Sequence, residues 1–184
     1  MTEKQQIANY IKIMKIMGKF GKYTRLYGQY DRENNIVYIS DGCCIFPIPS
    51  EIYVENSIAT KCPMLMEIEN STIDLKKIIL DTVNDFNTAN CIMTTILVNL
   101  GKYNEEKLTH VYKCGDKFGV VDKKYIEIMN LLPPVLKDHN PIAKDTKSPI
   151  VGYTENYYTM GFAILPIYCD FVDIMARLGF SKEN

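Results

Sequence analysis

The amino-acid sequence predicts an α+β fold, with antiparallel sheets that carry helices packed on one face. Segments of strand-like composition follow one another across turn-forming residues, as in hairpins, and helical segments separate these groups. The chain has 184 residues, of which 47% are hydrophobic and 23% charged, a balance typical of one globular domain or two small ones. Its longest apolar runs fall short of the roughly 20 residues that cross a bilayer, so we expect no membrane-spanning helix.

The chain begins with a predicted helix at residues 3–17. Ile13, Met14 and Met17 share one arc of this helix, and its lysines share another arc. Gly18 is expected to end the helix. The pattern therefore predicts an amphipathic helix with one apolar and one basic face.

The remaining elements follow from turn residues and prolines. Pro47 and Pro49 place the end of a strand at a sheet edge, and Pro133 stops a helix. Strands are predicted at residues 23–30, 36–40, 43–48, 64–69, 107–113, 118–121, 150–153 and 157–165, and a well-buried strand rich in Ile, Leu, Val and Thr at residues 91–100. Helices are predicted from Ser71 or Thr72 to about residue 86, at residues 123–132 after an Asp122 cap, and at residues 168–178. Residues 135–148 are polar and are expected to form a long exposed loop.

Charge is distributed unevenly along the chain. The net charge is −1, which alone argues against a nucleic-acid binder. Residues 1–25, however, carry six basic side chains and one acidic side chain, and the rest of the chain carries a net charge of −6. A basic segment before an acidic body indicates an anionic partner. Lysines also interrupt the apolar residues of this segment, so we expect no secretory signal and a cytoplasmic location.

The residues that carry chemistry form no recognisable catalytic motif. The six cysteines include no Cys-x-x-Cys pair and lie mostly among apolar neighbours, which is typical of reduced structural thiols. Phosphate-binding, hydrolase and zinc-protease motifs are also missing from the sequence. We therefore predict no enzyme activity, no catalytic or metal site and no cofactor. A metal-dependent nuclease, built from scattered carboxylates such as Asp81 and Asp85, is the alternative.

Two stretches of the sequence share a pattern with one family. Residues 36–42 read Ile-Val-Tyr-Ile-Ser-Asp-Gly and are followed by apolar residues, as in a strand that enters an Asp-Gly turn. Residues 117–132 read as a strand that leads into a tyrosine-led helix, and residues 164–167 read Ile-Leu-Pro-Ile. These stretches resemble the bacterial DNA sliding clamp, the processivity factor of replicative DNA polymerases.

The match to the clamp family is partial. In its Ala-Thr-Asp-Gly turn, Asp41 and Gly42 match outright and Ser40 replaces the threonine. Cys44 stands where a basic residue is usual, so no role carries over to it. The resemblance implies a reduced or divergent relative of the kind that a phage or mobile element encodes.

The resemblance also implies an architecture and partners. In a clamp-like fold, helices line an inner surface that faces double-stranded DNA, and the protein forms a homo-oligomer. The closing residues Leu165, Pro166 and Ile167 would lie near a groove that binds a polymerase or another replication protein. Residues 1–63 would form a basic helix with a hairpin half-domain and residues 64–184 a clamp-like domain with a C-terminal helix, unless the two form one continuous domain.

The basic arc of the first helix is the predicted DNA-binding site. Contacts to phosphates need charge and not base-edge geometry, and lysine supplies a flexible point charge. We expect sequence-independent DNA contacts from Lys4, Lys12, Lys15, Lys19 and Lys22. The simpler interpretation is a solvated helix face in a lysine-rich protein.

Two functions from different classes are therefore predicted. The first is a non-enzymatic, clamp-like protein that associates with DNA or assists replication. The alternative is a protein-interaction module without DNA binding, which mimics a clamp or inhibits a host replication or defence protein. The helix at residues 3–17 contains no Trp and is of moderate length, so we expect no membrane partner.

Overall fold

The computed structural model describes residues 1–69, 73–85, 87–101, 107–137, 141–154 and 160–167. Its helices are α1 (Glu3–Phe20), α2 (Ser50–Thr60), α3 (Leu65–Glu69), α4 (Leu75–Val83), α5 (Lys123–Met129) and α6 (Pro134–Lys137). Its strands are β1 (Tyr27–Asp31), β2 (Ile36–Ser40), β3 (Cys44–Pro49), β4 (Ala89–Asn99), β5 (Leu108–Cys114), β6 (Lys117–Asp122), β7 (Ile142–Ala143), β8 (Ile150–Thr154) and β9 (Met160–Ile164). The predicted helix at residues 168–178 lies outside the described residues.

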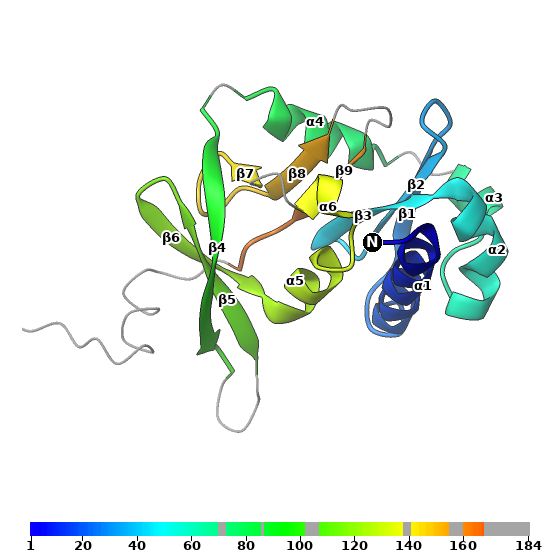
Figure 1. Ribbon diagram of the computed structural model, residues 1–184, viewed down its shortest axis with the longest axis horizontal. Helices are drawn as coiled ribbons and strands as arrows, with labels where there is room; N and C mark the ends of the chain where they lie inside the picture. The colour runs from blue at the N-terminus through cyan, green and yellow to red at the C-terminus, as the bar shows by residue number, and fades with distance from the viewer. Residues whose placement is uncertain (70–72, 86, 102–106, 138–140, 155–159, 168–184) are drawn as a thin grey trace, which may run out of the picture.

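The described strands form one antiparallel sheet in the order β1-β2-β3-β9-β8-β7-β4-β5-β6 (Figure 1). β4 connects its two parts, because Ala89 and Asn90 pair with β7 and the following residues pair with β5. The predicted α+β class with antiparallel strands is confirmed. Because β3 pairs with β9, strands from both sides of residue 63 belong to the same sheet. A domain boundary at that residue stays a prediction.

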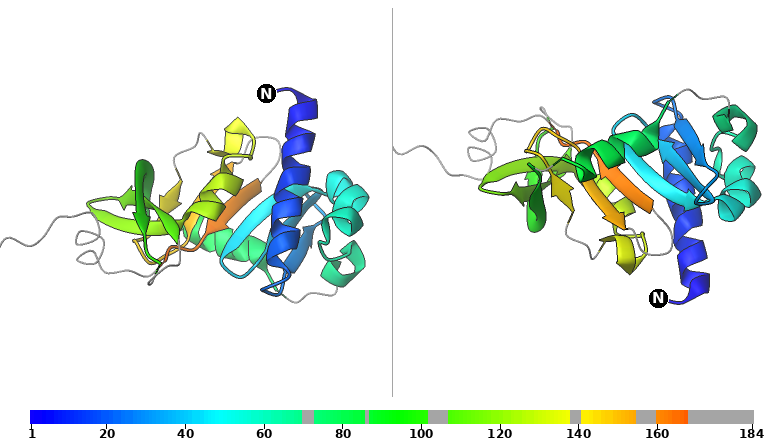
Figure 2. Two further views of the ribbon diagram at one scale, coloured as in Figure 1. Left: turned by 90° about the horizontal axis from the view of Figure 1, so that it is seen from below. Right: turned by 90° about the horizontal axis from the view of Figure 1, so that it is seen from above.

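Helices cover both faces of the main sheet. Side chains alternate along β2, so Val37 and Ile39 join the larger core with α1, whereas Ile36 and Tyr38 join a smaller core with α4. The two views of Figure 2 show α1 in front of the sheet from one side and α4 in front of it from the other. The sequence predicts that the helices pack on one face of the sheet. The helices other than α4 do so, whereas α4 packs on the opposite face.

α1 extends beyond its predicted end at residue 17. At its start, the Thr2 side chain accepts a hydrogen bond from the Gln5 backbone N–H, and the Gln5 side chain accepts one from the Thr2 N–H. Gly18 lies inside the helix, where a Cβ would be 1.7 Å from the Thr60 carbonyl oxygen of α2. This glycine therefore permits close helix packing and does not end the helix. The buried face of α1 consists of Tyr10, Ile13, Met14, Met17 and Gly18.

Three helices, α2, α3 and α6, occur where the sequence predicts none. α2 follows β3 directly, and its N-cap Pro49 makes no side-chain hydrogen bond, so the polar cap that signals a helix is missing. Residues 64–69, predicted as a strand, form α3, so that prediction is wrong. Ile68 of α3 packs on Gly28, where a Cβ would lie 2.5 Å from the Ile68 Cδ1. The missing side chain on β1 makes room for a helix at this position.

The burial of two other segments differs from the sequence prediction. Ile92 and Ile96 of β4 are 59% and 44% exposed, because beyond Asn90 this strand pairs only with β5 among the described strands. The prediction of a well-buried strand is therefore wrong. The predicted loop at residues 135–148 contains part of α6 and all of β7, and it buries Leu136 and Ala143 completely.

An ion pair connects β1 to α4 across the edge of the smaller core. Lys76 Nζ lies 2.7 Å from Asp31 Oδ2, and Asn34 donates a second hydrogen bond to the same oxygen at 2.7 Å. Burial raises the pKa of Asp31, but hydrogen bonds from Lys76 and Asn34 outweigh it, so the pKa is lowered overall. The charged carboxylate is thus favoured in the folded state.

The Asp31 pKa predicts an acid-sensitive contribution to stability. A folded-state pKa below the unfolded value gives stability that is present above the unfolded pKa and lost as the pH falls through the folded one. We expect Lys76→Met to lower the free energy of unfolding by about 2 kcal/mol at pH 7, since it leaves a nearly buried carboxylate unpaired. Urea unfolding between pH 7 and pH 3 measures both effects. An Asp31→Asn variant with the same acid dependence as the wild type would contradict the assignment.

Candidate functional site

Four of the predicted DNA-binding lysines lie on the solvent-facing side of α1. At 100° per residue, Lys4, Lys12, Lys15 and Lys19 fall within an arc of about 80°, on the side opposite to the buried residues. All four side chains are exposed. The N-terminal end of α1 projects beyond the sheet, so this part of the helix is open on several sides (Figure 2).

Lys22 continues this row of lysines past the end of the helix. The Lys22 N–H donates to the Lys19 carbonyl at 3.2 Å, and the Tyr23 and Thr24 N–H groups both donate to the Phe20 carbonyl. The backbone therefore keeps a helical path through residue 24, and Lys22 falls on the same arc. The structure thus brings all five predicted lysines together. We call this set the lysine face: Lys4, Lys12, Lys15, Lys19 and Lys22.

The lysine face is electrostatically unopposed on its own helix. Glu3, in the first turn, is the single acidic residue of α1. None of the ion pairs within the described part of the chain involves one of the five lysines. Five exposed positive charges within one arc give this side of the molecule a positive potential that attracts anions.

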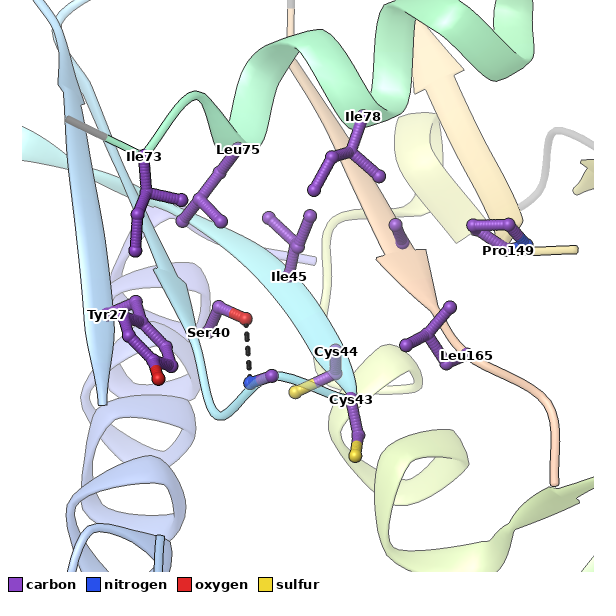
Figure 3. A pocket seen from close by; sticks show the side chains of 12 residues that line it. Tyr27, Ser40, Cys43, Cys44, Ile45, Ile73, Leu75, Ile78, Pro149 and Leu165 are labelled. Atoms are coloured by element: carbon purple, nitrogen blue, oxygen red, sulfur yellow. Dashed lines mark hydrogen bonds between the residues drawn. The ribbon is translucent and has the colours of Figure 1, made fainter. Parts of the chain in front are cut away.

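A second candidate site is an apolar pocket on the opposite face of the sheet. Its volume is about 220 Å³. Its walls come from five segments, which are β1, the end of β2 with the start of β3, α4 with the residues before it, Pro149, and β9 with the residue after it. Figure 3 shows Leu75 and Ile78 pointing from α4 toward Ile45, Ile73 pointing from the segment before α4 toward Tyr27, and Leu165 on the far side. Ile73, Ile78 and Leu165 are all exposed. The pocket can accept an apolar side chain, and its lining includes no charged residue.

Only one of the three predicted partner-binding residues lines this pocket. Leu165 lines the pocket, and its N–H donates to the Cys43 carbonyl at 2.8 Å. Pro166 and Ile167 are not among the lining residues. The Ile167 N–H donates to the Val120 carbonyl of β6, so the chain has already turned toward the other end of the sheet. A partner groove that includes Pro166 and Ile167 stays a prediction.

The Asp41-Gly42 turn, which is part of the resemblance to the clamp family, holds neighbouring elements together through hydrogen bonds. The buried Asp41 carboxylate accepts hydrogen bonds from the backbone N–H groups of Cys43 and Cys44, and its other oxygen accepts one from the Tyr125 hydroxyl at 2.7 Å. Gly42 has a φ of 89°, which favours glycine. Burial and the hydrogen bond to Asp41 raise the pKa of Tyr125. The turn thus connects β2 and β3 to α5.

Most of the described cysteines are buried, and the described carboxylates form no metal-ligand cluster. Five cysteines in this part of the chain are free, and four of them are buried. Burial raises the pKa of the Cys44 thiol well above its usual value, which makes it a poor nucleophile. Asp85, a carboxylate that could share a metal with Asp81, instead pairs with Lys144 at 3.0 Å. A search of the described ranges finds no cluster of three or more potential metal ligands.

Comparison with protein-family models, with curated proteins and with solved structures finds no match to this chain. Among the described helices, none combines the length and the apolar character needed to span a membrane. The resemblance to the sliding clamp therefore rests on the sequence patterns alone.

Sequence reasoning did not identify two features of these sites. The pocket assembles from segments far apart in the chain, so no local pattern marks it. Tyr23 directly follows Lys22 and is 88% exposed, more than any other large hydrophobic side chain among the described residues. The sequence does contain a signal for Tyr23, because this aromatic residue lies between the basic residues Lys22 and Arg25.

Proposed function

We propose that this protein is a non-enzymatic, clamp-like DNA-associated protein that binds DNA without regard to sequence through the lysine face. The observation that supports the proposal is the arrangement of four exposed lysines in one arc of α1, which Lys22 continues in the turn after the helix. Lysine ammonium groups contact phosphates as point charges and give affinity without reading bases. A role as a replication accessory in the cytoplasm, where its thiols stay reduced, fits the resemblance to the sliding clamp.

The anchoring of α1 supports the proposal. Its apolar face packs into the larger core, and the side chain of Asn9 donates to the Leu131 carbonyl at 3.1 Å. The helix is therefore held on one side by the core and leaves the lysine face free to meet a partner. A rigid row of charges loses less conformational entropy on binding than a disordered basic tail does.

The proposal predicts that the triple variant Lys12→Glu, Lys15→Glu, Lys19→Glu loses DNA binding. We expect its affinity for a labelled 20-base-pair duplex to fall about 100-fold or more at 50 mM salt, because three phosphate contacts become repulsive. Fluorescence anisotropy measures the affinity. The fold should persist because the three side chains are exposed.

A matched control separates the lysine face from total charge. The variant Lys77→Glu, Lys107→Glu, Lys117→Glu changes the net charge equally, and these exposed lysines lie on α4, before β5 and on β6. It should bind DNA within a few-fold of the wild type. Equal losses in both variants would show that only net charge matters. No binding by the wild type at low salt would refute the proposal and favour the protein-interaction alternative, for which the pocket around Leu165 is the candidate surface.

A further inference from the structure

The lysine face ends in an exposed aromatic ring. Tyr23 is 88% exposed, and it follows Lys22 in the turn that continues α1. Because the backbone keeps its helical path there, Tyr23 falls at the border of the arc that holds Lys12 and Lys19. Within the described part of the chain, no aromatic or cation–π contact involves the Tyr23 ring.

Arg25, a planar cation, lies two residues after Tyr23 in the chain. The Arg25 guanidinium lies 5.7 Å from the centre of the Tyr27 ring, and Arg25 itself is exposed. Basic residues flank Tyr23 on both sides in the sequence, with Lys19 and Lys22 before it and Arg25 after it. An exposed aromatic ring among cations provides a stacking surface for a base next to charges for the phosphates.

Whether the bases are already stacked determines whether duplex or single-stranded DNA can bind to this aromatic surface. In a duplex each base already stacks on its neighbours inside the helix, so a side chain on the outside meets only phosphates and groove edges. In a single strand the face of a base is available. Stacking on an aromatic side chain contributes affinity for every base, because each has a π-face.

We propose that the end of the lysine face binds single-stranded DNA, with the Tyr23 ring stacked on a base and Lys19, Lys22 and Arg25 against the neighbouring phosphates. This inference rests on the proposed function and names the form of DNA that the site prefers. The helical path from Lys4 to Tyr23 is about 28 Å long at 1.5 Å per residue. That length accommodates about eight nucleotides at the 3.4 Å spacing of stacked bases, and fewer of an extended strand.

Tyr23→Ala tests the stacking contact. Fluorescence anisotropy with a labelled 12-nucleotide thymidine strand should show binding by the wild type that is at least about tenfold tighter than binding to a 12-base-pair duplex closed by a hairpin loop. Tyr23→Ala should weaken binding to the strand by about tenfold or more and leave binding to the duplex within twofold. Tyr23→Phe, which keeps the ring, should bind the strand within twofold of the wild type.

Controls separate stacking from folding and from apolar surface in general. Ile58→Ala removes another exposed apolar side chain, 79% exposed on α2, and should leave both affinities unchanged. The melting temperature of Tyr23→Ala should match that of the wild type, since the ring is exposed. A 12-nucleotide uridine RNA distinguishes DNA from RNA as the strand, and tighter binding to the RNA than to the thymidine strand would overturn the assignment to DNA.

The outcomes distinguish this inference from the proposed function. Equal affinity for strand and duplex, or a Tyr23→Ala variant that binds the strand like the wild type, overturns the single-strand inference and leaves the lysine face as a DNA site. No binding to either form at 50 mM salt overturns both. A preference for the strand that disappears in Tyr23→Ala supports the inference.

Discussion

Replacing Gly18 with alanine is expected to lower the free energy of unfolding by about 3 kcal/mol. In an ordinary helix the same change stabilises by about 1 kcal/mol, because alanine has the higher helix propensity. Here the new Cβ would lie 1.7 Å from the Thr60 carbonyl oxygen and 2.9 Å from its carbon. These are backbone atoms of α2, so α1 and α2 must move apart to accept the methyl group.

Gly21→Ala is the matched control for Gly18→Ala. Gly21 has a right-handed helical φ of −56°, and a Cβ there would meet the Leu26 side chain at 3.0 Å, which can move. We expect a change of less than about 1 kcal/mol for this variant. Urea unfolding followed by circular dichroism measures both. A Gly18→Ala variant as stable as the wild type would show that α1 and α2 do not pack as closely as described.

Asp41→Ala is expected to cost about 3 to 4 kcal/mol of stability. The variant removes the acceptor for the Cys43 and Cys44 N–H groups and for the Tyr125 hydroxyl, and each donor left unpaired in a buried place costs about 1 kcal/mol or more. Cys44 and Tyr125 are both buried, so water replaces these bonds poorly. The loss should appear as a lower midpoint of urea unfolding.

A double-mutant cycle with Tyr125→Phe tests the mechanism of this loss. Alone, Tyr125→Phe should cost about 1 to 2 kcal/mol, because it removes the hydroxyl bonded to Asp41 at 2.7 Å. In the Asp41→Ala background the same change should cost almost nothing, since the hydroxyl has already lost its partner. Additive losses would mean that the two side chains do not interact.

The sequence predicts elements whose signals are local. The two-strand unit β5 and β6 surrounds Gly115, which has a φ of 57°, and α5 begins at Asp122, whose side chain accepts from the Lys124 N–H as a cap should. α1 follows from the period of its apolar residues. In these cases the residues that specify the structure lie within a few positions of one another, so they can be recognised without the fold.

The missed elements depend on contacts between distant parts of the chain. α2 buries the small polar residues Ser57 and Thr60 where Gly18 of α1 approaches, and a search for apolar periodicity does not detect such a face. α3 exists where Gly28 of β1 leaves room for Ile68. The lysine face was visible in the sequence because it lies on one continuous helix. The pocket was not, because five separate segments form it.

The salt dependence of DNA binding tests the central claim most directly. If the five lysines contact phosphates, the logarithm of the association constant should fall against the logarithm of salt concentration with a slope of about −3.5 to −4.5. In the Lys12→Glu, Lys15→Glu, Lys19→Glu variant the slope should become shallower by about 2 to 3, because three of these contacts are gone. A wild-type slope near zero, or the same slope in both proteins, would contradict DNA binding by the lysine face.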